Sequence, residues 1–417
     1  MNLRVKSVFN NSVVIWFLAM SPIIDIIYTI NNRYLSFSFP IQQIIRIFIV
    51  FYFLYGIKNK KYRITIIALF ALLTLGQVYI ILNNYPYSIT SNFGYIFKIL
   101  NLFCVAFYIK ENLNGDNFIL SDLIKAIKVS GIILSLNIIM SNILKVGLKT
   151  YNYGNRSGYK GFIEAHNDVT VVLLIILPII LYSFIKYRNK LDLLIITAII
   201  ISLILIGPKA GKFLLIIEII MFLFIYFRGL KLNSCVKKFI GFMLIFLTLF
   251  VYTDLNSTLI KLTDYASKRG YDSIYSYVVS YRNIQPRLID NGLADKFEIH
   301  PKYLFGTGYY YGNNVLNLQK NDFYSIENDF DGLTYYSGLL TAAVIIFILA
   351  LFVYNIVDSN TDDKTLKKMV IISITIALIH SFFGGHVIYS ALANTYFGAI
   401  LGIGFYKNTK HIDSKGL

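Results

Sequence analysis

The segment Gly207–Lys212 stands at the start of an apolar run and combines glycine, proline and lysine. Proline suits the first turn of a helix, whose free N–H groups and positive dipole attract phosphate. Lys209 and Lys212 beside that helix end would add two cations to an anion site. The alternative is a turn whose lysines extend to lipid headgroups. The residue types alone leave both interpretations open.

Arginine and glycine are combined in a second polar segment, which runs from Arg282 through Arg287 to Gly306 and Gly308. A guanidinium group binds phosphate oxygens with two parallel hydrogen bonds. The two glycines would let the backbone approach a ligand or adopt a positive φ. An ordinary loop turn has the same composition, so this segment is a candidate anion-binding site with an open alternative.

Acidic residues precede a late apolar run, in the sequence Glu327-Asn328-Asp329-Phe330-Asp331-Gly332. Asp331 is placed as expected for an acid that caps the amino end of a helix. Glu327 and Asp329 lie further out, and either carboxylate has the chemistry of a general base toward a hydroxyl group. Gly338 is expected inside the first turns of the following helix.

The segment 145–166 has an excess of basic residues, with Glu164 as its only acid. Long loops carry charge of either sign regardless of topology, but this loop is short, which favours a functional reason for the excess of bases. The loop returns to an apolar run through Glu164-Ala165-His166-Asn167-Asp168. Ionisable residues at such an entry point indicate function, because leaving them in lipid is costly. His166 is therefore a candidate ligand-binding residue.

Two further histidines, His380 and His386, flank the end of another apolar run. No two of these histidines fall within one helical turn, so no metal site is expected. The chain has no Walker, dinucleotide-binding, zincin or serine-hydrolase motif, and no cofactor is expected. Without nucleotide machinery, the energy for a reaction must come from an activated substrate or from a gradient.

Composition places these candidate residues in an integral membrane protein. The 417 residues are 56% hydrophobic and only 15% charged, whereas a soluble domain carries roughly 25% charge. Apolar runs near 18 to 20 residues recur along the chain, and roughly 20 residues cross a bilayer. The expected spans are 13–30, 40–57, 64–82, 93–109, 127–144, 167–185, 191–207, 212–227, 238–253, 333–357, 369–386 and 388–406. The predicted fold is all-α, with about twelve transmembrane helices.

Short loops orient the spans, because lysine and arginine accumulate on the cytoplasmic side. Alternate loops carry the basic clusters Lys58–Arg63, Lys186–Lys190, Arg228–Lys238 and Lys364–Lys368, whereas 83–92 has no basic residue. Both termini are therefore expected in the cytoplasm. This topology accounts for most of the net charge of +17 without a nucleic-acid partner.

The predicted organisation has three parts. Residues 1–253 hold spans one to nine, residues 254–332 form a long loop on the outer face between spans nine and ten, and residues 333–417 hold the last three spans and a cytoplasmic tail. Arg46 and Lys98 lie inside spans near the same outer face. Glu218, inside the eighth span, is expected to pair with Lys212 or Arg46. The two cysteines, Cys104 and Cys235, lie in or beside apolar runs and predict no disulfide framework.

This arrangement resembles the superfamily of O-antigen polymerases and O-antigen ligases, also called Wzy-type polymerases and WaaL-type ligases. The family has about twelve spans and a large late loop on the outer face, as predicted here over the whole chain. Lys209 resembles the family's basic residue at a helix start, where arginine is more usual. Arg282 before Gly306 and Gly308 resembles its loop arginine. Glu327-Asn328 before Gly338 resembles its His-Asn motif, with glutamate in place of the ligase histidine.

The resemblance implies a glycosyltransferase reaction without a metal, in the bacterial inner membrane. An undecaprenyl-pyrophosphate-linked glycan would donate its chain to a hydroxyl group of another lipid-linked repeat unit. Arg282, Lys209 and Arg156 would bind the departing pyrophosphate, and Glu327 or Asp329 would act on the acceptor. The implied partners are this lipid-linked glycan, the bilayer and a chain-length regulator protein. Glu327 favours polymerisation of repeat units, for O-antigen or capsule, over the ligase reaction.

Three other functions fit the same architecture. An O-antigen ligase would move finished glycan onto a lipid acceptor, and another membrane glycosyltransferase or acyltransferase would share the outer-face site. A flippase for lipid-linked glycans is also polytopic. Transporters usually carry charged or broken helices near the bilayer midplane, whereas the ionisable residues here gather toward the outer face.

Overall fold

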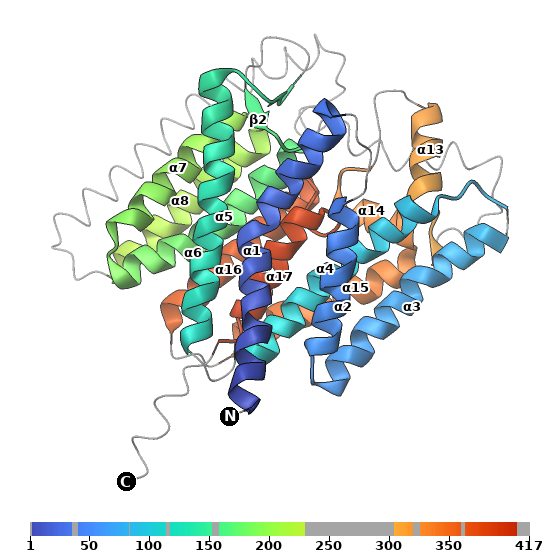
Figure 1. Cartoon of the computed structure of the whole chain (residues 1–417), viewed down its shortest axis with the longest axis horizontal. Helices are drawn as coiled ribbons and strands as arrows, with labels where there is room; N and C mark the ends of the chain where they lie inside the picture. Colours follow the sequence, from blue (N-terminus) through green and yellow to red (C-terminus); the bar gives the residue numbers. More distant parts are fainter. Residues whose placement is uncertain are drawn as a thin grey trace.

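The computed structural model describes residues 2–35, 41–82, 84–113, 117–151, 158–229, 304–319, 326–359 and 363–406. Within them, almost all secondary structure is helical (Figure 1). The helices are α1 (Asn2–Tyr34), α2 (Ile41–Gly56), α3 (Lys60–Leu82), α4 (Ile89–Asn112), α5 (Asn117–Leu144), α6 (His166–Tyr187), α7 (Lys190–Ile206), α8 (Lys209–Gly229), α13 (Tyr309–Gln319), α14 (Asp329–Ser337), α15 (Leu339–Asp358), α16 (Lys364–Phe383) and α17 (Ala391–Ile403). A short hairpin pairs β1 (Leu148–Lys149) with β2 (Tyr159–Gly161).

Seven of the described helices are long and apolar enough to cross a membrane, namely α1, α3, α4, α5, α6, α15 and α16. Helix α2 is a shorter apolar helix, and so is α17. Large apolar side chains such as Phe48, Tyr55 and Phe347 are exposed on the outside of the bundle. A soluble monomer rarely exposes so much apolar surface, whereas lipid tails cover it without cost. The prediction of an all-α polytopic membrane protein is therefore confirmed.

Helix α17 lies in the centre of the bundle, and every one of its residues is buried. Its closest neighbours are α4 and α6. Gly398 and Gly402 face α4 so closely that an added Cβ atom would lie 2.5 Å from the carbonyl oxygen of Leu102 and 2.6 Å from the Cβ atom of Ile109. Small residues four apart allow this approach between membrane helices. At about 1.5 Å per residue, 13 residues are too short to cross about 30 Å of hydrocarbon.

The predicted tenth span, 333–357, is wrong as one continuous helix. The chain is helical from Asp329 to Ser337 and again from Leu339 to Asp358, and Gly338 separates α14 from α15 with φ 83° and ψ 158°. An added Cβ atom at Gly338 would lie 2.2 Å from the carbonyl oxygen of Leu304. The break therefore forms where the 304–308 segment packs against the chain. The predicted ninth span, 238–253, lies outside the described residues.

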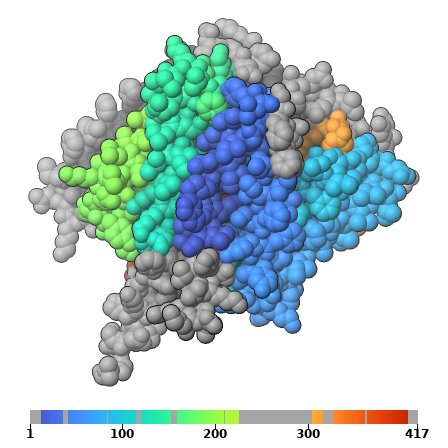
Figure 2. Space-filling model, in the orientation of Figure 1, coloured from blue at the N-terminus to red at the C-terminus, as the bar shows by residue number. Residues whose placement is uncertain are grey.

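The bundle has two ends of different composition. At the lysine-rich end lie the carboxyl ends of α2, α4 and α6 and the amino ends of α3, α5, α7 and α16, with the clusters around Lys58, Lys186 and Lys364. The β hairpin and α13 lie at the opposite end (Figure 1). Helix α1 runs between these ends along the face of the molecule, flanked by α2 and α5 (Figure 2).

Candidate functional site

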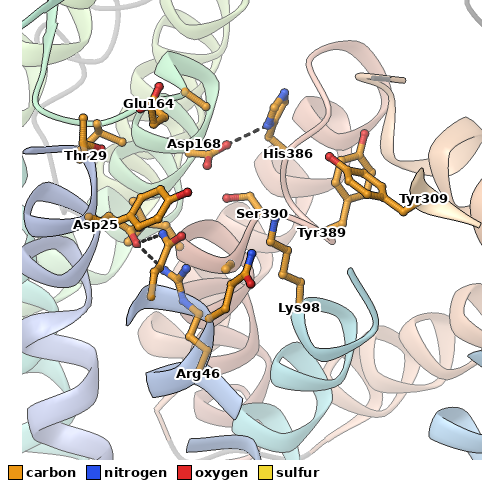
Figure 3. Close-up of a pocket in the computed structure, with 17 residues that line it drawn as sticks. Asp25, Thr29, Arg46, Lys98, Glu164, Asp168, Tyr309, His386, Tyr389 and Ser390 are labelled. Atoms are coloured by element: carbon orange, nitrogen blue, oxygen red, sulfur yellow. Dashed lines mark hydrogen bonds and ion pairs between the residues drawn. The ribbon is translucent and has the colours of Figure 1, made fainter. Parts of the chain in front are cut away.

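A polar pocket of about 280 Å³ lies at the end of the bundle opposite the lysine-rich end (Figure 3). Its walls come from the carboxyl end of α1, the amino ends of α2 and α6, the third turn of α4, and the connection between α16 and α17. Segments far apart in the sequence thus meet around one cavity. The lining residues that carry charge, hydroxyl groups or rings are Asp25, Tyr28, Thr29, Arg46, Lys98, Glu164, Asp168, Tyr309, His386, Tyr389 and Ser390.

A buried ion pair forms one wall of the pocket. The Nη2 atom of Arg46 lies 2.7 Å from Oδ1 of Asp25, and the two side chains are only 5% and 6% exposed. The Gln42 amide also donates to Asp25 Oδ1. A single buried charge is costly, so Asp25 on α1 needs its contacts with Gln42 and Arg46 on α2 when the two helices pack. The three side chains form one polar wall of the pocket.

A second pair faces it across the cavity. The Nδ1 atom of His386 lies 2.8 Å from Oδ1 of Asp168, which is in the first turn of α6. His386 has φ 68°, a left-handed conformation that non-glycine residues adopt mainly where surrounding contacts impose it. Burial alone would lower the pKa of His386, but the contact with Asp168 and the charges of Glu327 and Asp329 outweigh it, so this pKa lies above its ordinary value.

Asp329 fastens the segment that carries His386. Its Oδ2 atom accepts hydrogen bonds from the Ser381 hydroxyl at 2.5 Å and from the backbone N–H groups of Val387 and Ile388 at 2.8 and 3.2 Å. The side chain is fully buried. Burial raises the pKa of Asp329 to about 6, although these hydrogen bonds oppose the rise. The observed contacts make Asp329 a residue that positions the pocket wall.

Tyrosines form the remaining side of the pocket. The hydroxyl group of Tyr389 donates to the carbonyl oxygens of Ile326 and Glu327 at 2.5 and 2.9 Å. The rings of Tyr95 and Tyr309 are stacked with centroids 5.2 Å apart, and Tyr389 lies 5.9 Å from Tyr95. Aromatic rings held in this way offer apolar faces beside polar groups, a combination suited to a ligand with both.

Several residues predicted from the sequence are not among the described residues that line this pocket. The ring of His166 packs against Tyr151 with centroids 5.3 Å apart. Glu327 is half-buried, and its charge acts on His386. Lys212 is exposed on α8, whose first residue is Lys209. Lys212 does not line the pocket.

The two predicted glycines contact protein backbone. An added Cβ atom at Gly306 would lie 2.5 Å from the Gly338 nitrogen, and one at Gly308 would lie 2.4 Å from Ile80. The Gly308 N–H donates to the Tyr336 carbonyl at 3.1 Å. These contacts place Tyr309 at the pocket. The other predicted residues, Arg156, Arg282 and Arg287, lie outside the described part of the chain.

The expected pairing of Glu218 with Lys212 or Arg46 is wrong. Arg46 binds Asp25 instead, and Lys212 points out of the bundle. Glu218 is buried on α8, and neither of its carboxylate oxygens has a hydrogen-bond partner among the described residues. Within the same part of the chain, no cluster of three or more His, Cys, Asp or Glu residues could hold a metal ion.

The sequence reasoning missed Asp25, Tyr309 and Tyr389 as pocket residues. It gave Lys98 no role and considered Arg46 only as a partner of Glu218. The signal for the charged ones was their position inside apolar runs, where an ionisable residue is costly and indicates function. The tyrosines gave no such signal, because the chain holds 33 of them.

Comparison with known families relates the chain that forms this pocket to one family of membrane proteins. The sequence model of a family described as "O-antigen ligase like membrane protein" matches residues 7–272, more than half of the chain. The match includes Asp25, Arg46, Lys98 and Asp168 and ends before His386. No curated protein matches the chain. The chain belongs to the O-antigen ligase like membrane protein family.

Proposed function

We propose that this protein polymerises undecaprenyl-pyrophosphate-linked oligosaccharide repeat units on the outer face of the bacterial inner membrane. The observation that carries the proposal is the charged, tyrosine-lined pocket at one end of an apolar helix bundle, in a chain of an O-antigen ligase like family. A lipid-linked glycan matches both features, because its polyprenyl chain can stay in the bilayer beside the apolar helices while its sugars enter the polar pocket.

The reaction is a glycosyl transfer. The oxygen of an acceptor hydroxyl group attacks the anomeric carbon of the donor glycan, and the bond from that carbon to the pyrophosphate oxygen breaks. The lipid pyrophosphate leaves with the electron pair, and a base takes the hydroxyl proton. Cationic side chains stabilise the charge that develops on the leaving group.

The residue roles inferred from the family resemblance complete this proposal. Arg282 is proposed as the catalytic cation, with Lys209, Lys212, Arg156 and Arg287 assisting in anion binding. Asp329 is buried behind His386, so its influence on the acceptor would be exerted through that segment. Glu327 does not line the pocket, and its proposed influence on the acceptor would come through its charge, which acts on His386.

The proposed orientation places both termini in the cytoplasm and the pocket outside. The support is the distribution of basic residues, because the loops at the lysine-rich end match the cytoplasmic loops predicted from charge. The pocket lies at the other end, where repeat units carried across the membrane become available. A chain-length regulator is the expected protein partner.

A ligase reaction is the second candidate, and the description of the matched family favours it. The donor is the same, but the acceptor is a finished lipid core. The glutamate at position 327, where ligases have histidine in the resembling motif, supports polymerisation instead.

Deletion of the gene, with surface polysaccharide separated on a gel beside complemented cells, tests the proposal. Polymerisation predicts that long ladders collapse to a core bearing one repeat unit. A ligase predicts polymer accumulating on its lipid carrier with no glycan on the core. Repeat units trapped on the cytoplasmic face would identify a flippase and contradict both transferase reactions.

A further inference from the structure

We infer that the pocket is the acceptor-sugar site, in which His386, oriented by Asp168, takes the proton from the attacking hydroxyl group. This inference rests on the proposed function and deepens it by assigning the ligand and the base. The ligand is the terminal, non-reducing sugar of a repeat unit. Neither the leaving pyrophosphate nor its lipid occupies this site.

The charge balance of the lining supports a sugar. Three acids, Asp25, Glu164 and Asp168, face three bases, Arg46, Lys98 and His386. Arg46 and His386 are already paired with Asp25 and Asp168, and Glu164 is paired with Arg33. A pyrophosphate site would need a surplus of cations, whereas paired charges present donors and acceptors together. Such a surface matches the hydroxyl groups of a sugar.

The size of the pocket and its polar atoms agree with this ligand. A volume of about 280 Å³ is near the lower limit of ligand pockets, which span roughly 300–1,000 Å³, and suits one sugar ring rather than a lipid carrier. Thr29 is 1% exposed, and its Oγ1 atom has no hydrogen-bond partner among the described residues. The same holds for Nε of Arg46. Buried polar atoms are normally bonded, so both atoms are available to a polar ligand.

The geometry at His386 is that of an oriented base. Asp168 engages Nδ1, which leaves Nε2 as the nitrogen that can accept a proton. As the acceptor oxygen bonds to the anomeric carbon, its proton moves to Nε2, and Asp168 stabilises the imidazolium ion. The lipid pyrophosphate leaves with the electron pair of the broken bond. After the product departs, the imidazolium ion releases its proton to water.

The surroundings of His386 determine the pH at which this step works. The charged or titratable groups facing it are Asp168 on α6, Glu327 and Asp329 before and in α14, Lys98 on α4, and Tyr389 on its own segment. The three acids raise the pKa of His386 and outweigh the effect of burial. A base must be neutral, so turnover should rise with pH through a value above the ordinary pKa of His, about 6.5.

Binding is tested first, with oligosaccharide released from the lipid-linked repeat unit that a deletion strain accumulates. This probe carries no pyrophosphate. Saturation-transfer NMR on the purified protein in nanodiscs should detect it, and Thr29→Val should weaken it about three- to tenfold, as expected for one lost hydrogen bond. Thr197→Val is the matched control, since that hydroxyl group bonds to Leu193 in its own helix. Displacement of the oligosaccharide by inorganic pyrophosphate, or no weakening by Thr29→Val, overturns the assignment.

The base is tested by turnover of the lipid-linked repeat unit in liposomes. His386→Gln should lower kcat about 10²- to 10⁴-fold while oligosaccharide binding changes less than threefold. Asp168→Asn should move the acidic limb of the kcat profile to lower pH, which a merely structural role would not do. Asp122→Asn, a carboxylate change at the lysine-rich end, is the control.

The outcomes separate this inference from the proposed function. If the wild-type protein makes polymer and His386→Gln retains its rate, the acceptor-site inference fails alone. An unshifted pH profile in Asp168→Asn has the same meaning. If the wild-type protein binds the oligosaccharide but forms no glycosidic bond, the proposed function fails.

Discussion

Two ion pairs of similar length, one at each end of the bundle, differ in burial. Lys125 and Asp122 form a contact of 2.8 Å with side chains 67% and 21% exposed. The Arg46–Asp25 pair is equally short, at 2.7 Å, but almost fully buried. Exposed pairs contribute roughly 0–1 kcal/mol, whereas removing one member of a buried pair costs about 3–5 kcal/mol.

A third pair shows that burial alone does not mark a functional site. Lys128 and Asp192 lie 2.6 Å apart toward the lysine-rich end, and Asp192 is buried. This pair joins α5 to α7 and lines no part of the pocket. The pocket end differs because two pairs, Arg46–Asp25 and His386–Asp168, face a cavity. Buried charges therefore indicate a functional site where they border space that a ligand can enter.

Arg46→Met should produce the largest difference between the two ends. It leaves the Asp25 carboxylate buried without its cation, and we expect a loss of about 3–5 kcal/mol in the free energy of unfolding. The double variant Asp25→Asn/Arg46→Met should recover most of this loss. Thermal unfolding in detergent, followed by near-UV circular dichroism, measures both. Equal stability of Arg46→Met and the wild-type protein would contradict the importance of the pair.

Gly385→Ala tests the backbone of the pocket wall. Gly385 has φ 66°, and an added Cβ atom would lie 1.3 Å from the Glu327 carbonyl oxygen. We expect destabilisation of about 2–4 kcal/mol and loss of turnover, because the His386 segment must move. Gly404→Ala is the comparison: its φ is −59°, and the three atoms nearest to the added one belong to the Ile356 side chain. A cost of about 1 kcal/mol is expected there. Similar effects at both positions would sink this prediction.

Asp329→Asn should change the pH dependence of stability. The pKa of Asp329 in the folded protein, about 6, lies above the value of about 3.9 in an unfolded chain. Ionisation of Asp329 therefore destabilises the folded state relative to the unfolded chain. The protonated carboxyl group contributes its full stabilisation below about pH 4, and this stabilisation is lost as the pH rises through about 6. Relative to Asp329→Asn, the wild-type protein should lose about 2–3 kcal/mol between pH 4 and 7.5. Unfolding midpoints that run parallel with pH would refute this assignment.

Lys125→Met should have the smallest effect. Its pair with Asp122 is largely exposed, and we expect a change below about 0.5 kcal/mol with unaltered polymer length. Unfolding midpoints and a glycan gel of complemented cells provide the measurements. A loss as large as that of Arg46→Met would remove the distinction between the two ends.

The helices were predictable because hydropathy over about 20 residues reflects a strong physical requirement, the hydrocarbon thickness. The break at Gly338 was not, because it depends on a single residue in an apolar run and on contact with Leu304. The glycine was recognised, but nothing in its neighbours along the chain indicates the close approach of 304–308. The short length of α17 also depends on packing against α4.

The candidate site was only partly predictable. The entry segment around Asp168 was recognised from its charge, and Arg46 and Lys98 from their position in apolar runs. Which charges pair was not predictable: Arg46 binds Asp25 rather than Glu218, and Asp168 binds a histidine from the other end of the chain. Such pairs form only after the helices pack. The sequence motifs instead directed the prediction of the catalytic site to the long loop 254–332, where arginine and glycine suggested anion binding.

The most direct test of a polymerase whose acceptor base is His386 is reconstitution of the purified protein in liposomes with the lipid-linked repeat unit. Glycan length is measured on a gel for the wild-type protein, His386→Gln and Asp122→Asn. We expect a ladder from the wild-type protein and from Asp122→Asn, and no ladder from His386→Gln near pH 7. A full ladder from His386→Gln, or none from the wild-type protein, would contradict this function.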